Sequence, residues 1–140
     1  MRTGNGLLDL STPAIMGILN VTPDSFFDGG KFEGVDAALA QTETMLEEGA
    51  DIIDIGGMSS RPGASIISAD DEMSRVLPVI DAIHKRFADV ILSIDTIYSQ
   101  TAAAAIDAGA GIINDISAAA LDANIIQVAI DKKLPYILMH

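Results

Sequence analysis

The sequence has 140 residues, of which 49% are hydrophobic, and it contains neither Cys nor Trp. This composition predicts one domain with a substantial apolar core, and the lack of Cys excludes disulfides and thiolate zinc sites. The formal net charge of −12 would repel a phosphate backbone, so we expect no nucleic-acid partner. No apolar run reaches the roughly 20 residues that span a membrane, and the N-terminal residues lack a secretory signal layout. We therefore expect a cytoplasmic protein without a membrane partner.

Five short runs rich in Ile, Val and Leu alternate with stretches of helical spacing, an order that predicts an α/β fold with a parallel, helix-covered sheet. Asp36 and Asp70 mark expected helix starts, and Gly49 and Gly109 mark expected helix ends with left-handed backbone. The residues LLDL before the first run predict a short lead-in strand or a barrel plug. The expected strands are 14–19, 51–55, 90–94, 111–116 and 135–139, and the expected helices are 35–48, 70–87, 99–108 and 122–132.

Every expected strand ends in polar or glycine residues or is followed directly by them. The carboxyl ends of parallel strands share one edge, which is the catalytic rim of a β/α barrel and the ligand crevice of an open sheet. Each such residue alone is an ordinary turn residue, but five ends of this kind favour a binding edge over simple strand capping. The residues are Asn20, Gly56 with Gly57, Asp95, Asn114 with Asp115, and His140.

Two expected loops have unusual compositions, NVTPDSFFDGG at residues 20–30 and GGMSSRPGA at residues 56–64. Adjacent Phe26 and Phe27 gain little from exposure to water, so we interpret the first loop as a lid over a planar or apolar ligand. The sequence lacks both a GxGxxG fingerprint and a GxxxxGK[ST] phosphate loop. A glycosidase-like carboxylate pair could be drawn from Asp54, Asp95 and Asp115, but acidic residues are too abundant here for such a pair to be informative.

The strings NVTPDSF with DGG, DIGGMSSRPGA, SIDT, INDIS and the terminal LMH resemble, in this order, motifs of the dihydropteroate synthase family. The resemblance implies a parallel (β/α)₈ TIM barrel, of which residues 1–140 form the N-terminal part, about the first five β/α units, ending after the fifth strand. It implies a transferase of folate biosynthesis and sulfonamide target that condenses 6-hydroxymethyl-7,8-dihydropterin pyrophosphate with p-aminobenzoate. The products are 7,8-dihydropteroate and pyrophosphate, and the full-length enzyme is expected to be a homodimer.

The resemblance also assigns roles to residues. Asn20 matches the family's ligand to the Mg²⁺ that accompanies the pyrophosphate, and Ser60 matches a Thr that binds the pyrophosphate. Asp95 and Asn114 match residues that hold the pterin ring, and we expect both to be catalytic. An ionised Asp accepts two adjacent donors on the pterin edge, and its charge favours the pterin-methylene cation left when pyrophosphate departs. The residues expected to shape the p-aminobenzoate pocket are Thr22, Phe26, Arg61 and Pro62.

Two alternatives stay open at this point. A pterin-binding methyltransferase-type barrel shares the fold and the pterin pocket, although the NVTPDSF and SSRPG loops argue against it. A non-catalytic half-barrel that binds pterin or a partner through open sheet edges is a second alternative. The family's later lysine and Arg–His motifs are not among residues 1–140, so we expect this fragment to be inactive by itself.

Overall fold

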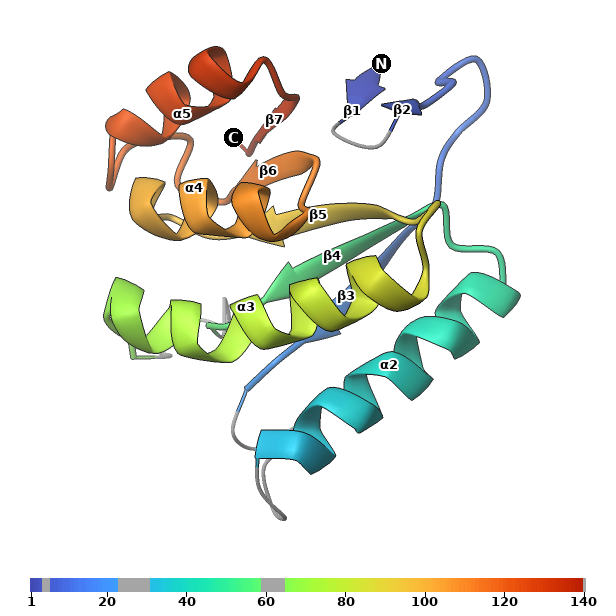
Figure 1. Ribbon diagram of the computed structural model, residues 1–140. Coiled ribbons are helices and arrows are strands. Elements are labelled where there is room, and N and C mark those ends of the chain that lie inside the picture. The colour runs from blue at the N-terminus through green and yellow to red at the C-terminus, as the bar shows by residue number, and fades with distance from the viewer. Residues whose placement is uncertain (4–5, 23–30, 59–64, 140) are drawn as a thin grey trace.

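The structure is a computed structural model that describes residues 1–3, 6–22, 31–58 and 65–139. Helices connect successive parallel strands and form a layer over one face of the sheet (Figure 1), which confirms the expected α/β architecture. The five strands lie in the sheet in their chain order: β3 (Met16–Asn20), β4 (Ile52–Gly56), β5 (Ile91–Asp95), β6 (Ile112–Asp115) and β7 (Tyr136–Leu138). The connecting helices are α2 (Lys31–Glu47), α3 (Ala69–Arg86), α4 (Ser99–Ala108) and α5 (Asn124–Lys132).

An antiparallel pair precedes the sheet, formed by β1 (Arg2–Thr3) and β2 (Gly6–Leu7). The backbone N–H of Leu8 donates to the carbonyl of Met1 at 2.7 Å and extends this pairing. The lead-in strand expected at LLDL is therefore only partly correct, because within that run only Leu7 belongs to a strand.

The helix ends confirm the glycine prediction, but one predicted helix start is wrong. Gly49 and Gly109 have φ angles of +103° and +124°, where a residue without Cβ is favoured. Helix α2 begins at Lys31, so Asp36 is an exposed residue inside the helix, where an acidic side chain is tolerated. At α3 the N-cap is Ser68, whose hydroxyl oxygen accepts from the N–H of Asp71 at 3.1 Å.

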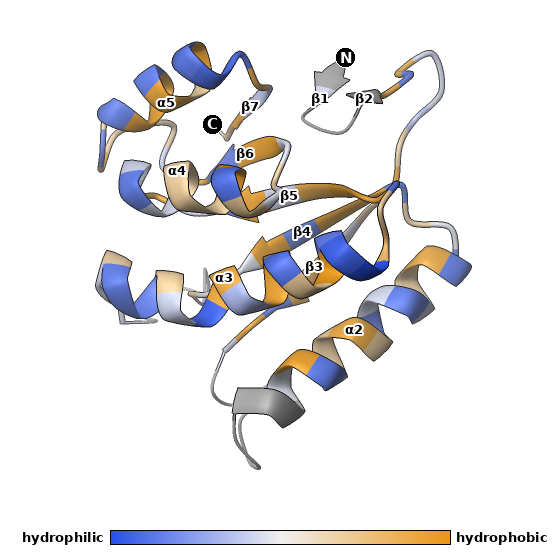
Figure 2. Ribbon diagram, viewed as in Figure 1, coloured by the Kyte–Doolittle hydropathy of each residue, from blue (hydrophilic) through white to orange (hydrophobic). Residues whose placement is uncertain are grey.

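The core lies between the sheet and the helices (Figure 2), where alternate residues of each strand meet apolar side chains of α3 and α4. On α3 the buried apolar residues recur at helical spacing, which places them along one side of the helix. Complete burial of one such Ile or Leu stabilises the fold by roughly 1.5–3 kcal/mol. The largest residues of this core with at most 1% exposure are Leu19, Ile53, Ile55, Ile80, Ile83, Leu92, Ile94, Ile113 and Ile125.

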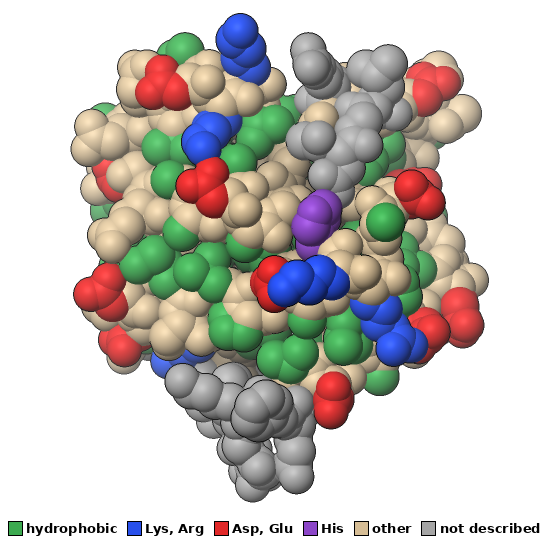
Figure 3. Space-filling view, in the orientation of Figure 1, with side chains coloured by type: hydrophobic (Ala, Val, Ile, Leu, Met, Phe, Trp, Pro, Cys, Tyr) green, Lys and Arg blue, Asp and Glu red, His purple; other side chains and the backbone are tan. Residues whose placement is uncertain are grey.

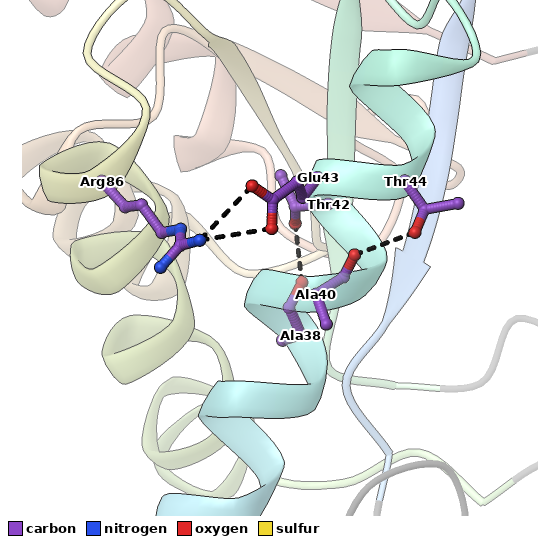
Figure 4. Close-up of polar contacts among 6 residues, drawn as sticks. All are labelled: Ala38, Ala40, Thr42, Glu43, Thr44 and Arg86. Carbon is purple, nitrogen blue, oxygen red and sulfur yellow. Dashed lines mark hydrogen bonds and ion pairs between the residues drawn. The ribbon is translucent and has the colours of Figure 1, made fainter.

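Polar contacts within and between the helices add to this packing, one at the surface and one in the interior. Arg86 of α3 forms an ion pair with Glu43 of α2 at 3.2 Å, and the hydroxyl of Thr42 donates to the carbonyl of Ala38 at 2.8 Å (Figure 4). This internal bond satisfies a Thr42 side chain that is fully buried. Figure 3 shows acidic and basic side chains scattered over the visible face and not gathered into one patch. Within the part of the chain that the structure describes, no helix has the length and apolar character needed to cross a membrane.

Candidate functional site

A row of residues lies near the carboxyl ends of four neighbouring strands, on the sheet face opposite the helices. In the parallel register Asn20 is beside Gly56, Gly56 is beside Asp95, and Asp95 is beside Asn114. The residue before each of them belongs to the helix-side core, and side chains alternate along a strand, so this row faces the other way. We call these four residues the polar row. The edge expected from the sequence is thus formed, with four of its residues side by side.

Gly56 leaves space for the side chains on either side of it. A Cβ at this position would lie 3.4 Å from Oδ2 of Asp95 and 3.6 Å from Oδ1 of Asn20. The two oxygens therefore flank the same point above the backbone of β4. A cation or a donor group placed at this point would meet an oxygen from each neighbouring strand.

Asp95 is the partly buried carboxylate at the centre of the row. Burial, followed by the negative charges of Asp54, Glu72 and Asp115, raises its pKa from the usual 3.8 to about 6. Among the described residues no hydrogen-bond donor reaches this carboxylate. Within the described part of the chain, Asp95 is consequently an acceptor without a donor, held where the ionised form is costly, and a ligand that donates hydrogen bonds would stabilise it.

Asn114 lies next to Asp95 and is tied to a second buried acid. Its Nδ2 donates to Oδ2 of Asp54 at 2.9 Å, and both residues are nearly inaccessible, with 9% and 4% of their surface exposed. Burial raises the pKa of Asp54, and the neighbouring Ser93 and Asn114 partly offset that effect. The Oδ1 atom of Asn114 is buried, and no described residue donates a hydrogen bond to it. Among these residues the amide therefore donates one hydrogen bond through Nδ2 and accepts none through Oδ1.

A third buried acid, Glu72 of α3, supports the end of β5. Its Oε2 accepts from the hydroxyl of Thr96 at 2.5 Å, and the Thr96 oxygen accepts from the N–H of Tyr98 at 3.1 Å. Burial raises the pKa of Glu72, although the hydrogen bond from Thr96, the nearby Thr101 hydroxyl and the charge of Arg75 oppose the rise. This network fixes the backbone immediately after Asp95.

Asp115 lies on the helix side of the sheet, where its carboxylate accepts hydrogen bonds from neighbouring residues. Its carboxylate accepts from the Tyr136 hydroxyl at 2.6 Å and from the N–H groups of Ser117 and Ala119 at 2.7 and 2.8 Å. Burial alone would raise the pKa of Asp115, but these hydrogen bonds outweigh it and the pKa is lowered. The bonds shape the turn after β6, where Ala118 and Ala119 have positive φ angles. Asp115 therefore organises a loop, and the structure gives no support to a catalytic carboxylate pair that includes it.

The donor set around Asn20 fits Mg²⁺. This ion prefers oxygen ligands, keeps several waters and usually takes only one or two protein ligands together with substrate phosphates. Oδ1 of Asn20 supplies such an oxygen, and Oδ2 of Asp95 lies across the same open point above Gly56. Within residues 1–3, 6–22, 31–58 and 65–139 no three His, Cys, Asp or Glu residues form a metal cage.

The other expected site residues are only partly placed. Thr22 follows β3 and is partly buried, close to Val21, whose N–H donates to the carbonyl of Gly56 at 2.7 Å. The chain thus enters the first loop beside the polar row. The remaining expected residues lie outside the described residues: Phe26, Ser60, Arg61, Pro62 and the strand-end residue His140.

Asp54 and Glu72 are site residues to which the sequence analysis assigned no role. The signal for Asp54 was a single acid within the apolar run IIDIG, because a charge inside a fully buried strand needs a reason. Glu72 carried no such signal, since three consecutive acids in the first turn of a helix are expected from the helix dipole.

Comparison with known proteins shows which family and which relatives the sequence matches. The family described as pterin binding enzyme matches residues 16–140. A dihydropteroate synthase of Streptococcus pyogenes serotype M1 is 49% identical over 140 residues, which cover 100% of this chain and 52% of that protein. A folate synthesis bifunctional protein of Pisum sativum, named as mitochondrial, is 49% identical over 100% of this chain and 28% of its own length. The chain thus spans about half the length of the bacterial relative and less of the plant protein.

Solved structures agree with the sequence matches. Dihydropteroate synthase from Clostridium difficile, solved in the presence of pteroic acid, superposes with a TM-score of 0.88 at 42% identity over 93% of this chain and 49% of that one. The Xanthomonas albilineans enzyme with 4-aminobenzoic acid gives 0.87 at 45% identity, over 95% and 48% of the two chains. These neighbours are TIM barrels of which the chain covers roughly half, which confirms the expected fold class.

Proposed function

This chain belongs to the pterin-binding enzyme family, and on that premise we propose that it forms the N-terminal half of a dihydropteroate synthase. The observation that carries the proposal is the polar row, in which Asp95 and Asn114 lie side by side with acceptor atoms that no described residue uses. A pterin edge with adjacent N–H and NH₂ groups supplies the matching donors.

In the proposed reaction the amine nitrogen of p-aminobenzoate bonds to the methylene carbon of 6-hydroxymethyl-7,8-dihydropterin pyrophosphate. The bond between that carbon and the pyrophosphate oxygen breaks, the electron pair leaves with pyrophosphate, and the nitrogen loses a proton. Asp95 accepts hydrogen bonds from the pterin ring, and its negative charge stabilises positive charge that develops as the leaving group departs. Asn114 fixes the ring orientation through its free carbonyl oxygen.

Asn20 would hold the Mg²⁺ of this site. When bound, the ion would offset the negative charge on the pyrophosphate and make it a better leaving group. The protein's own contribution is the oxygen of Asn20, held beside Asp95 across the space above Gly56. Thr22, Phe26, Ser60, Arg61 and Pro62 complete the proposed pocket around the pyrophosphate and the p-aminobenzoate.

Two finer expectations belong to this proposal. The full-length enzyme is a homodimer, which sedimentation of the purified protein would test. Its location is cytoplasmic, although the plant relative is named as mitochondrial, so fractionation of the source cells is the relevant measurement.

The test is a condensation assay on the intact protein, meaning this chain with any sequence that continues it in its gene. Incubation with dihydropterin pyrophosphate, p-aminobenzoate and Mg²⁺ is expected to yield 7,8-dihydropteroate and pyrophosphate in equal amounts. Chelation of the metal should stop the reaction and added Mg²⁺ should restore it. Residues 1–140 alone should be inactive. Binding of pterin by the intact protein without any condensation would contradict the enzymatic proposal and favour a pterin-binding module.

A further inference from the structure

Asp54 is a buried acid that the proposed chemistry leaves without a role. It lies in the middle of β4 with 4% of its surface exposed. The three ion pairs among the described residues are all at the surface, and none includes Asp54. Burial of a carboxylate without a cation is destabilising, so a residue such as Leu or Val would serve the fold better at this place.

The position of Asp54 relative to Asn114 suggests a role for this destabilising buried carboxylate. In the register Asp54 is beside Ser93, whereas Asn114 is beside Asp95, two residues further along β5. The 2.9 Å bond from Nδ2 of Asn114 to Oδ2 of Asp54 therefore crosses β5 diagonally. It joins two side chains of the same sheet face, directly below the carboxylate of Asp95.

The chemistry of the pair fixes the orientation of the amide. An ionised carboxylate only accepts hydrogen bonds, so Asn114 must turn its NH₂ group toward Asp54. The carbonyl oxygen then points away from Asp54, and this buried Oδ1 atom accepts no hydrogen bond from a described residue. With an apolar residue at position 54, the amide could rotate and present NH₂ in place of the carbonyl oxygen.

We propose that Asp54 is a positioning residue of the pterin site, which orients Asn114 so that its carbonyl oxygen accepts a hydrogen bond from the pterin. The inference rests on the proposed function, because it presumes a pterin ligand at the polar row. Asp54 itself stays beneath the ligand and acts through Asn114.

The experiment is a double-mutant cycle on the intact protein, with pteroic acid as the probe and calorimetry as the readout. Asp54→Leu removes the acceptor and should weaken binding about tenfold, which corresponds to one oriented hydrogen bond of about 1.4 kcal/mol. In an Asn114→Ala background the same change should weaken binding less than twofold, because the residue that Asp54 orients is already gone. Asp89→Leu, at an exposed position before β5, is the matched control and should leave the affinity unchanged.

The possible outcomes distinguish failure of this inference from failure of the proposed function on which it rests. If the wild type fails to bind pteroic acid, the pterin site itself is wrong and both proposals fall. If the wild type binds but Asp54→Leu has no effect, or its loss is the same with and without Asn114, only the positioning role is overturned. Asp54→Val carries the same expectations if thermal unfolding shows that Asp54→Leu does not fold.

Discussion

The two faces of the parallel sheet differ although the same strands build both. On the helix side the large side chains are apolar and closely packed, and the acid there, Asp115, has its hydrogen bonds supplied by neighbours. On the other face the strands carry polar side chains, Asp54, Asp95 and Asn114, and the carboxylate of Asp95 accepts no hydrogen bond from a described residue. Alternation along a strand thus separates the apolar residues that stabilise the fold from the polar residues of the candidate site. Substitutions on the two faces should consequently change different measurements.

The largest effect is expected on the helix side, at Leu92. This side chain is fully buried between β5 and the helices, so Leu92→Ala should lower the free energy of unfolding by about 2–5 kcal/mol. Denaturant unfolding measures the change. Leu92→Met, which nearly conserves volume, is the control and should cost less than about 1.5 kcal/mol. An Ala variant as stable as the wild type would mean that this face is not the core.

On the opposite face, Asp95→Asn should affect binding and leave folding intact. An amide cannot accept both donors of a pterin edge, so the affinity for pteroic acid should fall about 100-fold, or about 2.7 kcal/mol. Calorimetry on the intact protein tests this, with Asp89→Asn as an exposed control. Unchanged affinity in a folded Asn variant would show that Asp95 is a structural strand-end residue.

The pH dependence of stability tests whether the face opposite the helices disfavours the charge of Asp95. The pKa of Asp95 in the folded protein, about 6, lies above its usual 3.8, so its favourable contribution is fully present below about pH 4 and is lost as the pH rises through 6. Wild-type stability relative to Asp95→Asn should therefore fall between pH 4 and pH 7. Thermal unfolding of both proteins across this range measures the difference. Parallel curves would show that the environment of Asp95 does not disfavour its charge.

The smallest effect is expected at the outer surface, where Glu43 pairs with Arg86. Both side chains are about half exposed, at 49% and 52%, and solvent screens such pairs. Glu43→Gln should change the free energy of unfolding by less than about 0.5 kcal/mol, and 1 M salt should remove even that. A loss above 1 kcal/mol in denaturant unfolding would show that the contact between α2 and α3 depends on this pair.

The sequence predicted the elements and the polar row because both follow from local rules. Apolar runs with glycine or polar ends indicate strands, and the parallel arrangement then brings Asn20, Asp95 and Asn114 to one edge. The pairing of Asn114 with Asp54 could not be predicted, since it joins residues 60 positions apart and depends on a diagonal across β5. Asp36 was mistaken for a helix start because single acidic residues are common on exposed helix surfaces.

The identity between strand order in the sheet and strand order in the chain has a consequence for synthesis on the ribosome. Within these five strands, each new strand pairs with the strand made immediately before it, so none of these pairings must wait for a distant segment to emerge. Loop closure between neighbours in sequence is comparatively fast, and chains elongate at roughly 5–20 residues per second. The sheet can therefore grow one β/α unit at a time during translation, with the most recent strand always as its open edge.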